Sequence, residues 1–245
     1  MYQWRKNMPD KGSIISFLKK GISELSSENI GSSAKGNVDK SGYCYHTITK
    51  AWGNDNIFSG DVAKYRHSLL CKLCADKGVT ILFSVAMPTH THEVFITPNW
   101  ETLSETIRIL NTNVCKYIKK EMIKKGRKNT VVTKLFCDCP IYAIVKDIRY
   151  LFYLGKYIYD NPQYLKEEGR IVPYSCFWMF EKGYFKEPYD KAIYKKLFGL
   201  EPFDLLTIYQ TKTKDEVKAT AKQLFIKWTE EDNKRLFINS ERHHH

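Results

Sequence analysis

The sequence lacks any apolar run long enough to cross a membrane. A transmembrane helix needs about 20 consecutive apolar residues, whereas the longest run here, residues 79–87, is only as long as a strand. The N-terminal segment carries charged residues but lacks the apolar stretch of a secretory signal. We therefore expect a soluble cytoplasmic protein with no membrane partner.

Acidic residues are scarce relative to basic ones. The 245 residues include 27 Asp and Glu against 39 Lys and Arg, which gives a net charge of +12. Such an excess either serves solubility or favours a polyanionic partner, a nucleic acid or an anionic membrane surface. Hydrophobic residues make up 43% of the chain, enough for a folded core, so a fully disordered protein is excluded.

Cysteines are odd in number, seven, and no export signal accompanies them. This combination predicts reduced thiols rather than a disulfide framework. The closely spaced pairs Cys71–Cys74 and Cys137–Cys139 leave open a four-thiolate zinc module as an alternative. The first pair, however, lies inside an apparently helical run, whereas zinc-binding pairs usually occupy turns.

The hydrophobic periodicity predicts a ferredoxin-like α+β fold. Strands are expected at 43–49, 79–87, 90–97 and 133–139, and helices at 61–77, 103–122 and 144–161. The resulting order β-α-β-β-α-β-α is typical of an antiparallel sheet with helices on one face. Residues 1–40, rich in Ser, Gly and Asn, are expected to be a flexible basic arm, and residues 214–237 are helix-like.

Few histidines remain once the three at the C-terminus are set aside. His243, His244 and His245 are interpreted as the remnant of a purification tag, which leaves four of the seven. Two of those four, His90 and His92, lie two residues apart on a predicted strand. Residues i and i+2 of a strand point to one face, so both imidazoles can reach one divalent metal.

The helix predicted at 144–161 carries a second candidate pair. Tyr157 and Asn161 lie four residues apart and so share a helix face. Asn161 precedes Pro162 at the helix end, where its amide oxygen is available as a ligand. The alternative interpretation is that Tyr150, Tyr153 and Tyr157 form an aromatic stripe of the core.

Four segments together resemble a known family. AMPTHTHEVF and KYIYDNP, with YHTITKAWGNDNIF before them and IVPYSCFWM after them, resemble the REP-associated tyrosine transposases, relatives of the single-tyrosine HUH transposases. The resemblance covers residues 42–180. Thr91 and Glu93 depart from it, because the family has apolar residues at these positions.

The resemblance implies a site and a reaction. His90, His92 and Asn161 would bind Mg²⁺ or Mn²⁺, and Tyr157 would attack single-stranded DNA near a hairpin, giving a 5′-phosphotyrosine. It implies a catalytic domain at 41–180, after the arm at 1–40 and before a helical C-terminal extension at 181–242, with the tag remnant at 243–245. Such a protein would be nucleoid-associated in a bacterium, as a monomer or a homodimer.

Basic residues concentrate at one helix end and the loop after it, and they are candidate DNA contacts. They are Lys116, Lys119, Lys120, Lys124, Lys125, Arg127 and Lys128. A solvated helix face would look the same. The alternative to a transposase is a non-catalytic DNA-binding protein derived from one, and the altered histidine motif is what favours it.

Overall fold

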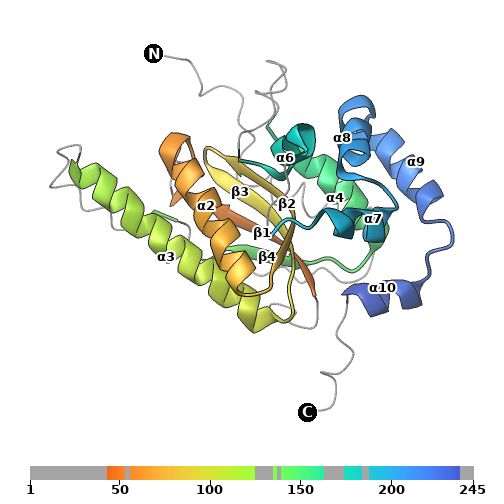
Figure 1. Ribbon diagram of the computed structural model, residues 1–245, viewed down its shortest axis with the longest axis horizontal. Helices are drawn as coiled ribbons and strands as arrows, with labels where there is room; N and C mark the ends of the chain where they lie inside the picture. Colours follow the sequence, from red (N-terminus) through yellow and green to blue (C-terminus); the bar gives the residue numbers. More distant parts are fainter. Residues whose placement is uncertain are drawn as a thin grey trace, which may run out of the picture. The chain divides into compact units, whose positions relative to one another are not determined.

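The computed structural model describes residues 43–52, 56–124, 135–136, 139–162, 174–183 and 188–237. Within these described residues, four strands come first, interleaved with three helices, and five further helices follow (Figure 1). The strands are β1 (Cys44–Lys50), β2 (Thr80–Met87), β3 (His90–Ile96) and β4 (Ile141–Ile144). The helices are α2 (Gly60–Asp76), α3 (Trp100–Lys124), α4 (Ile148–Asp160), α6 (Cys176–Lys182), α7 (Lys191–Phe198), α8 (Pro202–Thr211), α9 (Lys214–Leu224) and α10 (Glu230–Phe237).

The strands form one antiparallel sheet in the order β2-β3-β1-β4. The chain order β1-α2-β2-β3-α3-β4-α4 confirms the predicted α+β fold. The central strands β1 and β3 are almost wholly buried, as expected where both neighbours and both faces are covered. Their register places His92 opposite Ile48 and His90 opposite Lys50.

Helices cover both faces of this sheet, whereas the sequence predicted them on one. On β3, Thr91 and Glu93 receive hydrogen bonds from Arg66 of α2, while His92, on the other face, contacts Tyr157 of α4. Figure 1 shows α2 and α3 together on one side and α4 on the other. The second face also carries buried apolar residues, among them Ile48 and Val85, and the buried stripe of α4 covers this face.

The free edge of β2 is occupied by the segment before α7 and by α7 itself. Ile81 N donates to the Pro188 carbonyl at 3.3 Å. A hydrogen bond of 2.7 Å joins the hydroxyls of Ser84 and Tyr189, and the Tyr194 hydroxyl donates to the Leu82 carbonyl at 2.5 Å. The backbone groups of an edge strand are thereby partly satisfied from within the chain.

The fourth strand does not lie where the sequence predicted it. Residues 133–139 were expected to pair, but in the described part of this stretch Phe136 makes only an isolated bridge with Ala51. The strand is Ile141–Ile144, and Ile144 pairs with Tyr45. The helix predicted from residue 144 therefore begins at Ile148, because Asp147 accepts a hydrogen bond from Tyr150 N and caps it.

The C-terminal region is helical, as predicted. Apolar side chains of α8 and α9 are buried, among them Leu205, Leu206 and Val217. Thr213 and Glu216 form a reciprocal capping box at the start of α9. None of the described helices is long and apolar enough to span a bilayer. The predicted arm at 1–40 and tag remnant at 243–245 lie outside the described residues.

Candidate active site

His90 and His92 lie on the same face of the sheet. They are at the N-terminal end of β3, which pairs with the C-terminal end of β1. Their ring centroids are 5.0 Å apart, with the rings edge to face. Lys50 is directly opposite His90 in the β1–β3 ladder, and directly opposed residues point to the same face. The strand alternation expected from the sequence thus brings two imidazoles and one ammonium group together.

Each of the two rings is held through its Nδ1 atom. His46 Nε2 lies 3.0 Å from His92 Nδ1, and Thr89 Oγ1 lies 3.0 Å from His90 Nδ1. Among the described residues, no hydrogen bond uses Nε2 of either His90 or His92. A partner on one ring nitrogen fixes the tautomer and leaves the other nitrogen as a potential ligand atom.

Burial keeps these imidazoles neutral. It lowers the pKa of His46 to about 4, and burial followed by the charge of Lys50 lowers the pKa of His90 to about 4. Burial, with smaller contributions from His46, His90 and Lys50, lowers the pKa of His92 well below its usual value. A neutral ring retains a lone pair, which metal coordination requires.

Helix α4 brings Tyr157 to the histidine face. The Tyr157 ring stands edge-on to His92 at 5.7 Å between centroids and 87° between planes. Burial raises the pKa of the Tyr157 hydroxyl, and an interaction with the Asn161 side chain opposes this by lowering it. Asn161 occupies the C-cap of α4, one turn beyond Tyr157, as their spacing predicted.

Two other tyrosines of α4 have partners in other elements. Lys218 of α9 lies over the Tyr153 ring at 5.1 Å, and Tyr159 packs edge-on against Phe177 at 5.2 Å. Neither Tyr150, Tyr153 nor Tyr157 is fully buried, so the core stripe of α4 is aliphatic and phenylalanine instead. The fully buried residues of this stripe are Leu151, Phe152, Leu154 and Ile158.

The side chains of the site suit a divalent metal. The Nδ2 atom of Asn161 is buried and has no hydrogen-bond partner of good geometry within the described part of the chain. When the amide is turned over, its oxygen takes this position as a potential ligand atom, and the interaction that lowers the pKa of Tyr157 is then lost. Two neutral imidazoles and an amide oxygen are donor groups that a divalent metal ion accepts. No cluster of three or more His, Cys, Asp or Glu offers a rival site among the described residues.

Thr91 and Glu93, the two departures from the family motif, point away from the histidine face. Arg66 of α2 forms an ion pair of 2.5 Å with Glu93 and a hydrogen bond of 3.2 Å with Thr91. The Thr47 hydroxyl donates to the same carboxylate at 3.2 Å. Arg66 and Glu93 are 3% and 1% exposed. The two residues that depart from the family motif therefore belong to a buried polar network around Arg66.

Among the described cysteines of the two pairs, no metal-binding cluster is found. Cys71 and Cys74 are residues of α2, with Cys74 buried in the core. Cys139 is exposed, and Cys137 lies outside the described residues. Six cysteines, all of those described, carry free thiols, in agreement with the prediction of reduced cysteines.

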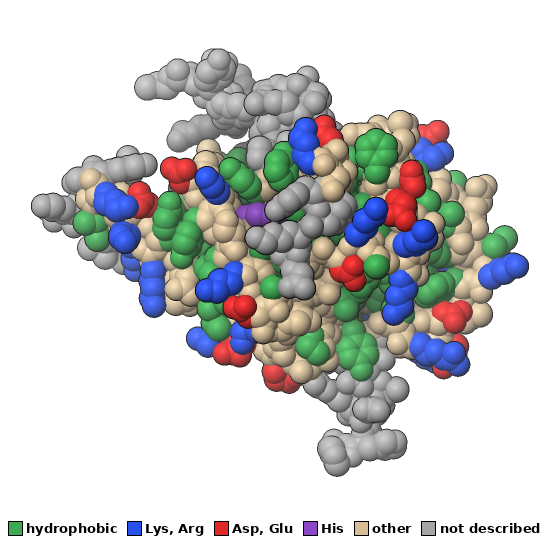
Figure 2. Space-filling view, in the orientation of Figure 1, with side chains coloured by type: hydrophobic (Ala, Val, Ile, Leu, Met, Phe, Trp, Pro, Cys, Tyr) green, Lys and Arg blue, Asp and Glu red, His purple; other side chains and the backbone are tan. Residues whose placement is uncertain are grey.

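Four of the predicted basic contacts are exposed on α3. They are Lys116, Lys119, Lys120 and Lys124. Lys124 pairs with Glu121 at 2.6 Å, whereas no ion pair involves the other three within the described residues. Figure 2 shows Lys and Arg side chains gathered over the C-terminal part of α3. Lys125, Arg127 and Lys128 lie outside the described residues.

Two residues of this face, His46 and Lys50, were not predicted to belong to the site. The sequence does indicate that they share one face of β1, because strand residues alternate between faces. Their contacts with His92 and His90 depend on the register between β1 and β3, about 45 residues apart in the chain, and no local pattern encodes that register.

Comparison with known proteins gives a family for this fold and site. A search of curated proteins finds no match. Two solved structures are similar: a REP-associated tyrosine transposase bound to a REP hairpin (18% identity, 64% of this chain and 89% of that chain, TM-score 0.43), and a candidate transposase from Deinococcus radiodurans R1 (16%, 54% and 95%, TM-score 0.36). The assignment rests instead on the family model "Transposase IS200 like", which matches residues 39–161, half of the chain. The chain belongs to the IS200-like transposase family.

Proposed function

We propose that this protein is a metal-dependent transposase that cleaves and rejoins single-stranded DNA near hairpins through Tyr157. Membership of the IS200-like family implies DNA cleavage by a tyrosine nucleophile and a requirement for a divalent metal. The observation that carries the residue assignment is the contact between the Tyr157 ring and His92, 5.7 Å apart across the space between α4 and the sheet.

Tyr157 supplies the nucleophile in this proposal. Its hydroxyl oxygen attacks the phosphorus of a DNA phosphodiester while the bond from phosphorus to the 3′ oxygen breaks. The phenolic proton is released, the 3′ oxygen takes up a proton, and the downstream DNA stays attached as a 5′-phosphotyrosine. Attack by a 3′-hydroxyl reverses these changes, so rejoining needs no further source of energy.

His90, His92 and Asn161 are the proposed metal ligands. A bound Mg²⁺ or Mn²⁺ would polarise the scissile phosphate and offset the negative charge that builds up on it. His46 and Thr89 would hold the two rings through their Nδ1 atoms. Because all three ligands are neutral, the full positive charge of the ion acts on an anionic substrate.

Basic residues support DNA as the substrate. Lys50 stands opposite His90 and takes part in no ion pair within the described residues, so its ammonium group is available for a phosphate oxygen. The exposed lysines of α3 add a positively charged surface that the backbone of a DNA strand can contact. We infer the hairpin from the resemblance of the site segments to the REP-associated transposases.

A labelled hairpin-bearing single strand tests the assignment of the nucleophile. With Mn²⁺ present, we expect the protein to form a denaturation-resistant adduct with 3′-labelled DNA and not with 5′-labelled DNA, because the downstream fragment carries the 5′-phosphate. Tyr157→Phe removes one oxygen and keeps the ring, so it should abolish the adduct and leave the melting temperature and DNA binding unchanged.

Tyr153→Phe and Tyr159→Phe are the matched controls, since both residues lie on the same helix and face other partners. Both should retain the adduct. An adduct that persists in Tyr157→Phe and disappears in one of the controls would move the nucleophile to that residue. Tight DNA binding by the wild type without any adduct would favour the non-catalytic alternative.

A further inference from the structure

The helices beyond the family match lie against the helix that carries Tyr157. The match ends at residue 161, so α8, α9 and α10 fall outside it. Helix α4 nevertheless packs against both α8 and α9, and its N-terminus bonds to residues at the start of α10. These contacts lie at both ends and in the middle of α4. We refer to α8, α9 and α10 together, residues 202–237, as the C-terminal unit.

Lys156 makes the contact nearest to the nucleophile. It precedes Tyr157 and is only 5% exposed. Its ammonium group donates to Asp160 at 2.9 Å and to the Tyr209 carbonyl at 2.7 Å. A buried cation needs such partners, and the carbonyls of the last turn of a helix such as α8 are acceptors without an intrahelical partner. Lys156 therefore joins the end of α8 to the turn of α4 that carries Tyr157.

Tyr209 makes the contact in the middle of α4. Its side chain is fully buried, and its hydroxyl donates to the Phe152 carbonyl at 2.8 Å. Gly155 allows this approach, because a Cβ at that position would collide with the Tyr209 hydroxyl and lie 2.7 Å from Phe83 Cζ. The Tyr209 side chain of α8 thus contacts the backbone of α4 directly.

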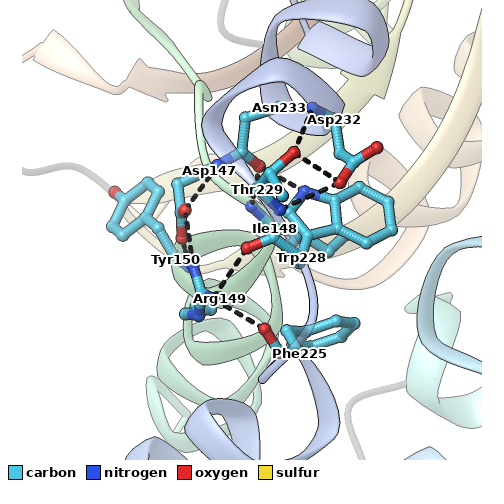
Figure 3. A network of polar contacts seen from close by, with 9 residues as sticks. All are labelled: Asp147, Ile148, Arg149, Tyr150, Phe225, Trp228, Thr229, Asp232 and Asn233. Carbon is cyan, nitrogen blue, oxygen red and sulfur yellow. Dashed lines mark hydrogen bonds and ion pairs between the residues drawn. The ribbon is translucent and has the colours of Figure 1, made fainter.

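Asn233 makes the contact at the N-terminus of α4 (Figure 3). Its Oδ1 accepts hydrogen bonds from Ile148 N at 3.1 Å and Trp228 Nε1 at 2.8 Å, and its Nδ2 donates to Asp147 Oδ2 at 2.8 Å. Asp147 is the N-cap of α4. One amide side chain therefore satisfies a first-turn N–H and orients the capping carboxylate at the same time.

Arg149 strengthens this end. Its Nη2 atom donates to the carbonyls of Phe225 at 2.6 Å and Trp228 at 3.1 Å, both in the link between α9 and α10 (Figure 3). Arg149 thus joins the first turn of α4 to the link between α9 and α10.

We propose that α8, α9 and α10 position the nucleophile, with Lys156, Tyr209 and Asn233 as positioning residues that fix α4 relative to His90 and His92. The inference rests on the proposed role of Tyr157. A displacement of about 1 Å at a reacting group can cost about a hundredfold in rate, and three contacts spread along α4 hold it against translation and rotation. The C-terminal unit thereby acts on the rate of attack and not on DNA affinity.

Tyr209→Phe tests the proposal, with Tyr194→Phe as its control. Both changes remove a buried hydroxyl that donates to a backbone carbonyl, of Phe152 in α4 and of Leu82 in β2 respectively. At saturating DNA, we expect Tyr209→Phe to slow adduct formation about tenfold with an unchanged half-saturating DNA concentration. Tyr194→Phe should leave the adduct rate unchanged although it lowers the melting temperature to a similar extent.

A second pair separates positioning from loss of folding. Lys156→Met should reduce the adduct rate, and Lys156→Arg, which keeps a cation, should restore most of it. Equal slowing by Tyr209→Phe and Tyr194→Phe, or a wild-type rate in Tyr209→Phe, overturns the proposal.

Hydrogen exchange provides a readout that needs no catalysis. In Tyr209→Phe, backbone amides of α4 should exchange faster than in the wild type, while those of α2 keep their rate. Unchanged exchange in α4 overturns the positioning role even if the protein forms adducts. Faster exchange in a protein that never forms an adduct supports the positioning of α4 and rejects the proposed function.

Discussion

At the scale of single residues, His46 is the side chain that most directly orients a proposed ligand. Its Nε2 lies 3.0 Å from His92 Nδ1, and the two rings are stacked with centroids 5.2 Å apart. The contact engages Nδ1 of His92 and leaves Nε2 as the potential ligand atom. His46 itself is 2% exposed, so it acts through His92 rather than on the substrate.

We predict that His46→Phe weakens Mn²⁺ binding about 10–100-fold, since loss of the group that holds a metal-binding histidine typically costs that much. Calorimetric titration of the protein with Mn²⁺ measures it. His67→Phe is the control, because His67 lies on α2 between Tyr174 and Tyr189, on the other side of the sheet. Equal losses in the two variants would remove His46 from the site.

Lys50 gives a second prediction for single residues. Its removal in Lys50→Met should slow adduct formation about tenfold or more, because a charge-assisted hydrogen bond contributes about 1.5–3 kcal/mol. Lys50→Arg should retain most of the rate. Lys64→Met, an exposed lysine of α2, serves as the control. The result to look for is a change in rate with no change in Mn²⁺ affinity; a wild-type rate in Lys50→Met would contradict the phosphate contact.

The sequence predicted part of the candidate site and missed the rest for a physical reason. The shared faces of His90 and His92, and of Tyr157 and Asn161, follow from strand and helix periodicity, which is local. The contact of His46 with His92 follows from strand register, and the contact of Arg66 with Glu93 follows from how α2 crosses the sheet. No short stretch of sequence encodes such contacts between distant residues.

At the scale of elements, the buried ion pair of Arg66 and Glu93 joins α2 to β3. Removing one member leaves an uncompensated charge in the core, so Arg66→Met should cost about 3–5 kcal/mol of unfolding free energy. Urea denaturation of the single and double variants measures this. The double variant Arg66→Met with Glu93→Met should cost clearly less than the sum of its singles.

Additive costs in that double-mutant cycle would show that the two side chains do not interact in the folded protein. A suitable comparison is the exposed pair of Lys77 and Glu105. Its removal should change the free energy of unfolding by less than about 1 kcal/mol, as is usual for surface pairs.

The elements themselves differed in how well the sequence predicted them. Strands β1, β2 and β3 and helices α2 and α3 are long and strongly patterned, and they lie where expected within a few residues. Strand β4 has only four residues, IYAI, too few to show the alternation that identifies a strand in a sequence. The longer stretch around Leu135 and Phe136 was expected to form the strand instead, although Phe136 makes only one bridge.

At the scale of the whole molecule, the net charge of +12 should make DNA binding strongly salt-dependent. Changing Lys116, Lys119 and Lys120 to Gln should flatten the slope of log affinity against log salt by up to about 2, at about 0.7 per lost phosphate contact on a single strand. Affinity should fall alike for different sequences, because phosphate contacts carry no sequence information. Fluorescence anisotropy with a hairpin-bearing oligonucleotide measures both.

The control removes the same number of charges from α7, at Lys191, Lys195 and Lys196. Two of these already pair with Glu201, so their loss should change the slope little. Equal slopes for the two triple variants would mean that total charge, rather than the α3 surface, governs DNA binding.

The occupied edge of the sheet also limits how molecules of this protein can stack. An exposed edge strand invites a strand from another chain and so leads to fibres or exchanged dimers. Along β2, the Pro188 carbonyl and the Tyr194 hydroxyl already bond to backbone groups of the strand. A neighbouring molecule can add a strand to β2 only after residues 188–194 have moved off its edge. Cleavage of the chain near residue 188 should therefore make the protein aggregate.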